Sequence, residues 1–165
     1  GFERAVPAMR RVREKTARGM ININSNAGHT TAIKALVDAG LDSMRVSIIS
    51  AQEAVYEAYY RPNYRLSDVE ASIHYARSKG VVVSLNLLTF PGLNDREDEV
   101  AAWLDFLGRT PVDMIQLRNL NMDPDWLLGE LPSGGKPIGV ANWIAAIKGA
   151  HPGIELASFT HYVKK

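Results

Sequence analysis

The sequence predicts an α/β fold in which a parallel sheet of about five strands curves as a partial (β/α) barrel and carries helices on its outer face. Apolar residues alternate along the 165-residue chain between helical and strand periodicity. Strands separated by helix-length segments favour right-handed crossovers and parallel pairing. The strands also carry polar side chains on one face, which a sheet covered by helices on both faces does not explain.

Residues that start or stop helices divide the chain into its helical segments. Pro7 is tolerated only in the first turn of the first helix, and Gly19 ends that helix. Thr30 or Thr31 caps the second helix, and Ser67 caps the fourth. The amphipathic segments predict helices over residues 3–18, 30–38, 51–60, 67–78, 97–107 and 139–149.

Short segments rich in apolar residues lie between these helices, and glycine, proline or polar turn residues bound them. Such segments are typical of strands. The predicted strands cover residues 20–25, 44–49, 81–89, 114–120 and 154–162. The resulting order is one helix followed by alternating strands and helices, with an extra helix after the second strand.

Polar side chains occur as pairs, two residues apart, on four consecutive strands. Alternate side chains of a strand point to opposite faces, so each pair shares one face and the residues between them share the other. The pairs are Asn22 and Asn24, Arg45 and Ser47, Ser84 and Asn86, and Gln116 and Arg118.

Two arrangements of the sheet are compatible with these pairs. Burial under helices would cost about 1–3 kcal/mol for each polar group left unpaired. A curved sheet, as in a partial TIM-like (β/α) barrel, places the apolar face against helices and the polar face around a lumen that can hold a polar ligand. The alternative is a flat sheet with scattered exposed polar residues. We favour the lumen.

The composition excludes several classes of site and partner. The chain contains no cysteine, which excludes disulfides, a thiol nucleophile and thiolate-held zinc or iron–sulfur sites within it. Its net charge of +1 gives no general attraction to nucleic acid, and the basic run over residues 10–18 is expected to be a solvated helix face. Neither a membrane-length apolar segment nor a signal-peptide pattern occurs, so we expect a cytoplasmic protein. The first residue is Gly1, which is compatible with a processed or truncated start.

Candidate loops follow the strands at their carboxyl ends, where parallel α/β sheets bind ligands. Residues 91–95 suit a tight turn as well as a binding loop, and the turn is the favoured interpretation. Residues 59–65 are either a flap over the lumen or a loop packed on its own aromatic rings. Among the histidines, only His29 lies at a strand end, and no metal-ligand spacing occurs. The acidic residues 97–99 suit a helix N-terminus and need no catalytic role, and no catalytic residue is assigned.

Several phrases, in order, resemble the radical S-adenosylmethionine (SAM) superfamily. Residues 23–28, INSNAG, resemble the third strand of its barrel, and residues 41–48, LDSMRVSI, are similar to the fourth. Residues 83–86 followed by PGLND at 91–95 resemble the fifth strand and the loop after it. The likeness runs from about residue 19 to residue 121.

The resemblance implies a six-stranded partial barrel that binds SAM and a [4Fe–4S] cluster and abstracts a substrate hydrogen through a 5′-deoxyadenosyl radical. It implies an oxidoreductase or activating-type enzyme, and the substrate stays open. Ile49 stands where many members carry aspartate, so no contact is assigned to that position. The residues that it places beside SAM or substrate are Asn24, Ser25, Arg45, Ser47, Asn86, Gln116 and Arg118.

The chain departs from the family pattern at its front. It has neither the CxxxCxxC loop that holds the cluster nor the glycine-rich phrase that grips the amino end of SAM. We therefore expect a single α/β domain over residues 1–165 that is a fragment of a larger barrel, without its first two strands. Such a fragment is expected to be inactive and unable to hold the cluster, and its exposed first strand could self-associate.

Two other readings of the sequence stay open. One is half of another TIM-barrel enzyme, such as an aldolase or isomerase, which would need a catalytic lysine or glutamate at a strand end. The other is a non-catalytic α/β binding module, which would have no affinity for SAM.

Overall fold

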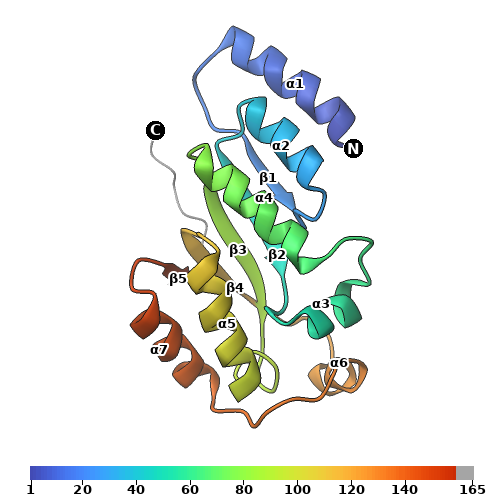
Figure 1. The fold of residues 1–165 in the computed structure, drawn as a ribbon, viewed down its shortest axis with the longest axis vertical. Helices are drawn as coiled ribbons and strands as arrows, with labels where there is room; N and C mark the ends of the chain where they lie inside the picture. The colour runs from blue at the N-terminus through green and yellow to red at the C-terminus, as the bar shows by residue number, and fades with distance from the viewer. Residues whose placement is uncertain (159–165) are drawn as a thin grey trace.

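The computed structural model describes residues 1–158, in which helices and strands alternate along the chain (Figure 1). The helices are α1 (Phe2–Lys15), α2 (Thr30–Asp38), α3 (Glu53–Tyr60), α4 (Leu66–Ser78), α5 (Glu97–Arg109), α6 (Pro124–Glu130) and α7 (Val140–Ala150). The strands are β1 (Asn22–Ser25), β2 (Ser43–Ile48), β3 (Val82–Thr89), β4 (Met114–Asn119) and β5 (Glu155–Ala157). No described helix is long and apolar enough to cross a bilayer.

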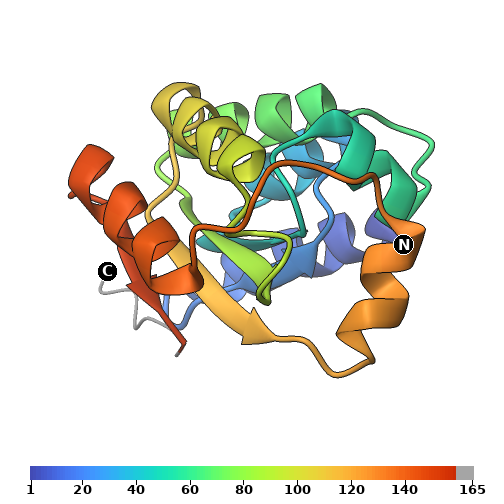
Figure 2. The same cartoon turned by 90° about the horizontal axis from the view of Figure 1, so that it is seen from below.

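The five strands form one sheet in the order β1-β2-β3-β4-β5, and all neighbouring pairs are parallel. Each strand therefore pairs with the next strand along the chain, as in the wall of a (β/α) barrel. Helices α2, α4 and α5 lie over one face of the sheet in both views (Figures 1 and 2). The predicted fold class is confirmed.

The hydrophobic core lies between the sheet and these helices. Most of the alternate strand residues predicted to face the helices are fully buried, including Val46, Leu85 and Ile115 at 0% exposure, whereas Ile23 and Leu117 are partly buried. Helices α5 and α7 contribute Trp103 and Trp143, which are buried to the same extent. Each such side chain stabilises the fold by roughly 1.5–3 kcal/mol, so this single face supplies most of the apolar burial.

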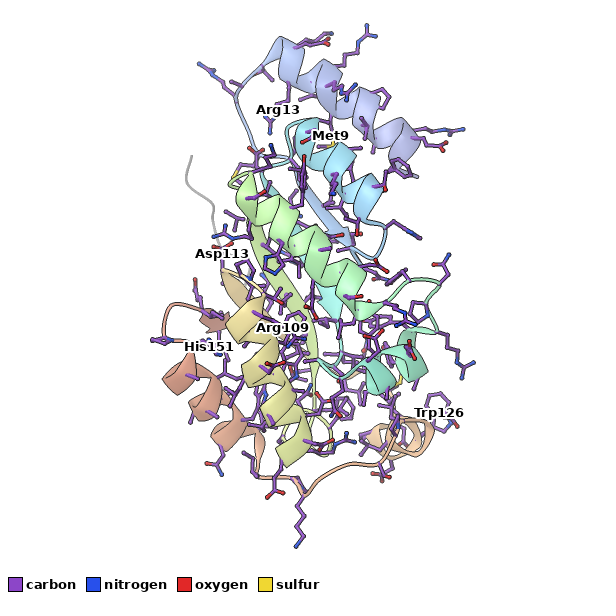
Figure 3. The ribbon with its side chains drawn as sticks, in the orientation of Figure 1. Met9, Arg13, Arg109, Asp113, Trp126 and His151 are labelled. Atoms are coloured by element: carbon purple, nitrogen blue, oxygen red, sulfur yellow. The ribbon has the colours of Figure 1, made fainter. Side chains whose placement is uncertain are left out.

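Helix α1 is attached through apolar side chains and one charged side chain. Met9 is buried in the core, and Ala5 and Val6 pack against it. The Arg13 guanidinium forms a salt bridge with the Asp42 carboxylate just before β2. The Met9 and Arg13 side chains point from α1 toward the rest of the fold (Figure 3). The same carboxylate accepts a 2.7 Å hydrogen bond from the Ile21 N–H. Pro7 lies beyond the first turn of α1, where it was not expected, and it leaves the Glu3 carbonyl without its helical donor.

Two predicted helix caps are wrong. His29, not a threonine, is the N-cap of α2, and the Thr30 hydroxyl instead donates a 3.0 Å hydrogen bond to the Asp68 carbonyl of α4. Ser67 lies inside α4, because Arg65 is the N-cap and its N–H donates to the Asp68 carboxylate at 2.9 Å. In α2, a hydrogen bond to a distant segment uses the threonine hydroxyl that was expected to cap the helix. In α4, the bond to the Asp68 carboxylate takes the place of the expected serine cap.

Helix α6 was not predicted. The asparagine and aspartate residues within 119–124 suit a turn, yet Asp123 caps a short helix by accepting hydrogen bonds from the N–H groups of Asp125 and Trp126 at 2.9 and 3.2 Å. Pro124 occupies the first turn, where its missing N–H costs nothing. The last strand covers Glu155–Ala157, and the predicted extension over residues 159–162 lies outside the described residues.

Candidate functional site

The polar pairs of four strands come together on the sheet face opposite the helices. In the observed register, one row aligns Asn24, Arg45 and Ser84, and the next aligns Ser47, Asn86 and Gln116. Because these rows cross adjacent parallel strands, the side chains form a continuous polar surface, which we call the inner face. The residues predicted from strand alternation to share a face therefore do share it.

Arg118 links two strands of the inner face. Its Nε donates a 2.8 Å hydrogen bond to Oδ1 of Asn86 on β3, and one terminal nitrogen donates a 3.1 Å bond to Oε1 of Gln116 on β4. The other terminal nitrogen donates to the Ser158 carbonyl at 3.2 Å. Gln116 is only 1% exposed, so its amide oxygen is held beneath the guanidinium. The three bonds fix the direction of the Arg118 head group.

The amino-end half of the inner face carries further polar groups. The Ser43 hydroxyl donates a 2.8 Å hydrogen bond to Oδ1 of Asn22, which ties β2 to β1. Glu155 of β5 lies opposite Met114 and therefore also belongs to the inner face, which the sequence analysis missed. Glu155 and Ala157 are two residues apart on a short strand, and this alternation could have predicted that they share the inner face.

Ser25 is not brought together with the other predicted residues. It aligns with Val46, whose side chain is buried beneath the helices, and its hydroxyl accepts a 3.0 Å hydrogen bond from the Ala27 N–H. The Ser25 side chain therefore takes part in the turn that ends β1.

The loop after β3 is a structural turn, as favoured. Asn94 is fully buried, and its side chain accepts a 2.9 Å hydrogen bond from the Phe90 N–H and donates a 3.3 Å bond to the Ile49 carbonyl. Asp95 accepts a 2.7 Å bond from the Gly92 N–H. These contacts close the turn and join it to the end of β2, which fixes the rim of the sheet at the carboxyl ends.

A buried polar cluster lies behind this rim at the N-terminus of α5. The Glu99 carboxylate is 0% exposed and accepts hydrogen bonds from the Ser50 hydroxyl and, at 2.9 Å, from the Gln52 amide. Its other oxygen has no hydrogen-bond partner within the described residues, and burial raises the pKa of Glu99. From sequence, residues 97–99 are expected only to favour a helix N-terminus through the dipole, because the partners of Glu99 lie far away in the sequence.

Asp98 in the same turn titrates in the opposite direction. Burial would raise the pKa of its carboxyl group, but hydrogen bonds from the Gln52 side chain, the Gly135 N–H and Arg96 outweigh it and lower the pKa to about 2. Arg96 also donates a 2.8 Å bond to the Pro132 carbonyl. The cluster thus anchors the segment between α6 and α7 to the start of α5.

Aromatic residues 59–65 pack on one another and on the loop after β1. The Tyr64 ring contacts the His29 ring edge-on at 5.4 Å between centroids, and Tyr60 lies 4.8 Å from both Tyr56 and Tyr59. A Cβ atom added at Gly28 would lie 2.1 Å from the Tyr64 ring, so glycine is required there. The segment is therefore packed at the carboxyl end of β1 through its own rings.

The inner face suits the adenosyl part of SAM, whereas no described residues suit an iron–sulfur cluster. Amide, hydroxyl and guanidinium groups are hydrogen-bonding partners for a ribose and an adenine edge. Within residues 1–158, no group of three or more His, Cys, Asp or Glu side chains could hold a metal, and the whole sequence lacks cysteine. A shallow hollow of about 430 Å³, lined by Arg10, Arg13, Glu14 and residues 38–40, lies away from this face, between α1 and the end of α2.

Comparison with known protein families identifies the superfamily of this chain. The sequence profile of the radical SAM superfamily matches residues 3–104, which is more than half of the chain. The chain belongs to the radical SAM superfamily. This membership favours the first of the three readings left open by the sequence over an aldolase or isomerase half-barrel. Comparison with curated protein sequences found no significant match.

Solved structures of radical SAM proteins share the fold. A domain of pyruvate-formate lyase-activating enzyme from Bacteroides vulgatus has a TM-score of 0.67 at 9% identity, over 94% of this chain and 90% of that domain. HemN, the coproporphyrinogen III oxidase of Escherichia coli, has a TM-score of 0.65 at 14% identity, over 91% of this chain and 37% of its own. The hydrogenase maturase HydG from Carboxydothermus hydrogenoformans has a TM-score of 0.54 at 12% identity, over 99% and 40%. At these identities the likeness shows the fold alone. The present chain spans no more than two fifths of the length of HemN or HydG.

Proposed function

We propose that this chain is part of a radical SAM enzyme that cleaves SAM and abstracts a substrate hydrogen, and that its inner face binds the adenosyl part of SAM. The observation that supports this most is the pairing of faces: polar residues of four adjacent strands align on one side, while the alternate residues are buried under helices. A polar surface of this extent on a (β/α) sheet is suited to a hydrogen-bonding ligand.

The proposed contacts use the residues that meet on the inner face. Asn24, Arg45 and Ser47 contact the cofactor from β1 and β2, and Asn86 reaches the ribose from β3. Gln116 and Arg118 contact the adenine and the substrate from β4, and Ser25 contributes only from the turn at the end of β1. When bound, SAM supplies the 5′-deoxyadenosyl group that abstracts the hydrogen. The residues of this chain bind and orient that group.

The 165 residues alone are proposed to be inactive. The cluster that the superfamily uses needs thiolate ligands, and this chain has no cysteine to supply them. We propose that these ligands lie on another segment of a longer cytoplasmic enzyme. Strand β1 pairs only with β2 within the described residues, so its other edge is a site for pairing with such a segment or with a second copy of the chain.

Calorimetric titration of the 165-residue chain with S-adenosylhomocysteine tests the proposed binding. Weak saturable binding is expected, and both Ser47→Ala and Asn86→Ala should reduce the affinity at least tenfold. Ser67→Ala on α4 and Asn142→Ala on α7 are matched controls, because both side chains are exposed on the opposite side of the sheet. Absence of binding at millimolar ligand, or equal affinity in all four variants, would contradict the proposal.

A further inference from the structure

Within the described residues, Arg118 forms no ion pair, unlike four other arginines. Four arginines form salt bridges with carboxylates; the pairs are Arg13 with Asp42, Arg77 with Asp113, Arg96 with Asp98, and Arg109 with Glu70 and Asp105. Arg118 instead donates to two amide oxygens and one backbone carbonyl, all of them neutral. Its guanidinium is held in place without contacting a negative charge among residues 1–158.

The nearest carboxylate along its own face is remote. Glu155 aligns with Met114, which precedes Arg118 by four strand positions. At about 3.3 Å per residue, this offset corresponds to roughly 13 Å along the sheet. Arg45, two strands away, lies in the same row as Glu155, because Arg45 aligns with Ser84 and Ser84 aligns with Met114. These two opposite charges therefore both lie toward the amino ends of the strands, and Arg118 supplies the positive charge of the inner face near the carboxyl ends.

The guanidinium retains donors for a ligand. It has five N–H groups, and its contacts with Asn86, Gln116 and Ser158 use three of them. A planar guanidinium with free N–H groups matches the oxygens of a carboxylate or phosphate, and hydrogen bonds between two charged partners are about twice as strong as neutral ones. The two amide oxygens position the head group before a ligand arrives, so binding an anion needs little further ordering.

From these contacts we propose that Arg118, positioned by Asn86 and Gln116, binds an anionic group, either a carboxylate or a phosphate, of a ligand on the inner face. This inference rests on the proposed function for placing the ligand there. The anion has two possible sources: the carboxylate of SAM itself, or a carboxylate or phosphate of the substrate. Asn86 and Gln116 are positioning residues for this contact.

NMR of the Arg118 Nε–H group in the 165-residue chain tests the proposal directly. Titration with inorganic phosphate at constant ionic strength should shift this resonance saturably. Arg118→Gln should weaken phosphate binding at least tenfold, and Arg118→Lys should restore part of it. Arg109→Gln, on the helical side of the sheet, is the matched control and should leave the affinity unchanged. Thermal melting by circular dichroism confirms that each variant is folded.

Asn86→Asp separates a role of charge from a role in folding. The new carboxylate would occupy the place of the amide oxygen that accepts from Arg118, and would neutralise the guanidinium while keeping the side-chain shape. Phosphate binding should then be abolished although the fold keeps its thermal stability. Phosphate affinity unchanged by Asn86→Asp or by Arg118→Gln would overturn the proposal. The absence of any phosphate-dependent shift up to 50 mM phosphate would also overturn it, because any binding would then be weaker than about 2 kcal/mol.

Two adenosine ligands identify the source of the anion. If S-adenosylhomocysteine displaces phosphate while methylthioadenosine, which lacks the carboxylate, does not, the anion belongs to the cofactor. If phosphate binds equally well at saturating S-adenosylhomocysteine, the anion belongs to the substrate. Methylthioadenosine binding without any Arg118-dependent phosphate site would overturn this inference alone. Failure of both adenosine ligands to bind would overturn the proposed function.

Discussion

Leu85 and Asn86 are neighbours in the sequence but belong to opposite faces of β3, so truncating each side chain to alanine should have different consequences. Leu85 is 0% exposed and packs in the core between the sheet and the helices. Leu85→Ala should destabilise the chain by about 3 kcal/mol, through lost burial and the cavity left behind. For a chain of this size, that loss corresponds to a melting temperature lower by about 6–12 °C.

Asn86→Ala should behave differently, because Asn86 is partly exposed and its main contact is the 2.8 Å hydrogen bond from Arg118. Water can replace that bond, so the expected cost is about 1 kcal/mol or less. Urea unfolding followed by circular dichroism measures both variants, with equal m-values required for the comparison. Equal destabilisation by the two substitutions would refute the assignment of an inner, ligand-accessible face, because it would mean that both sides of β3 are packed core.

Three further predictions concern contacts outside the inner face. Gly28→Ala should destabilise the chain by about 1–3 kcal/mol, because the new Cβ would overlap the Tyr64 ring. Much of this cost should disappear in the double variant with Tyr64→Ala, and additive costs of the two substitutions would contradict the overlap. Asp42→Asn should break the salt bridge with Arg13 and increase amide hydrogen exchange in α1 more than in any other helix, whereas uniform exchange would contradict the proposed attachment of α1. Burial raises the folded-state pKa of Glu99, so the folded state holds a proton that the unfolded state has lost, and stability should fall as pH rises from about 4.5 through that raised pKa. Glu99→Gln should remove this decline, which urea midpoints at pH 5 and pH 8 measure; an unchanged decline would show that Glu99 does not cause it.

The two faces of the sheet could be predicted from sequence because a strand has a period of two residues. Alternation alone placed Leu85 beneath the helices and Asn86 with Gln116 on the other face, and the observed register agrees. The order of strands followed from the helix-length segments between them, which favour sequential parallel pairing. These features depend on local patterns that one sequence displays.

Contacts between residues far apart in the sequence could not be predicted in this way. Arg13 and Asp42 looked like ordinary surface charges, and only the fold brings them together. Glu99 looked like a helix N-terminal residue because its partner Ser50 is 49 positions away. Helix α6 is a different case, since Asp123 followed by proline is a helix-start signal that suits a turn equally well.

The central claim is that the inner face binds the adenosyl group, and an NMR map of S-adenosylhomocysteine binding tests it most directly. The side-chain amide resonances of Asn24, Asn86 and Gln116 should shift together with one binding constant, while that of Asn142 on α7 stays unchanged. Shifts confined to the hollow between α1 and α2, or spread over the outer helices, would contradict the claim and place any ligand elsewhere on the molecule.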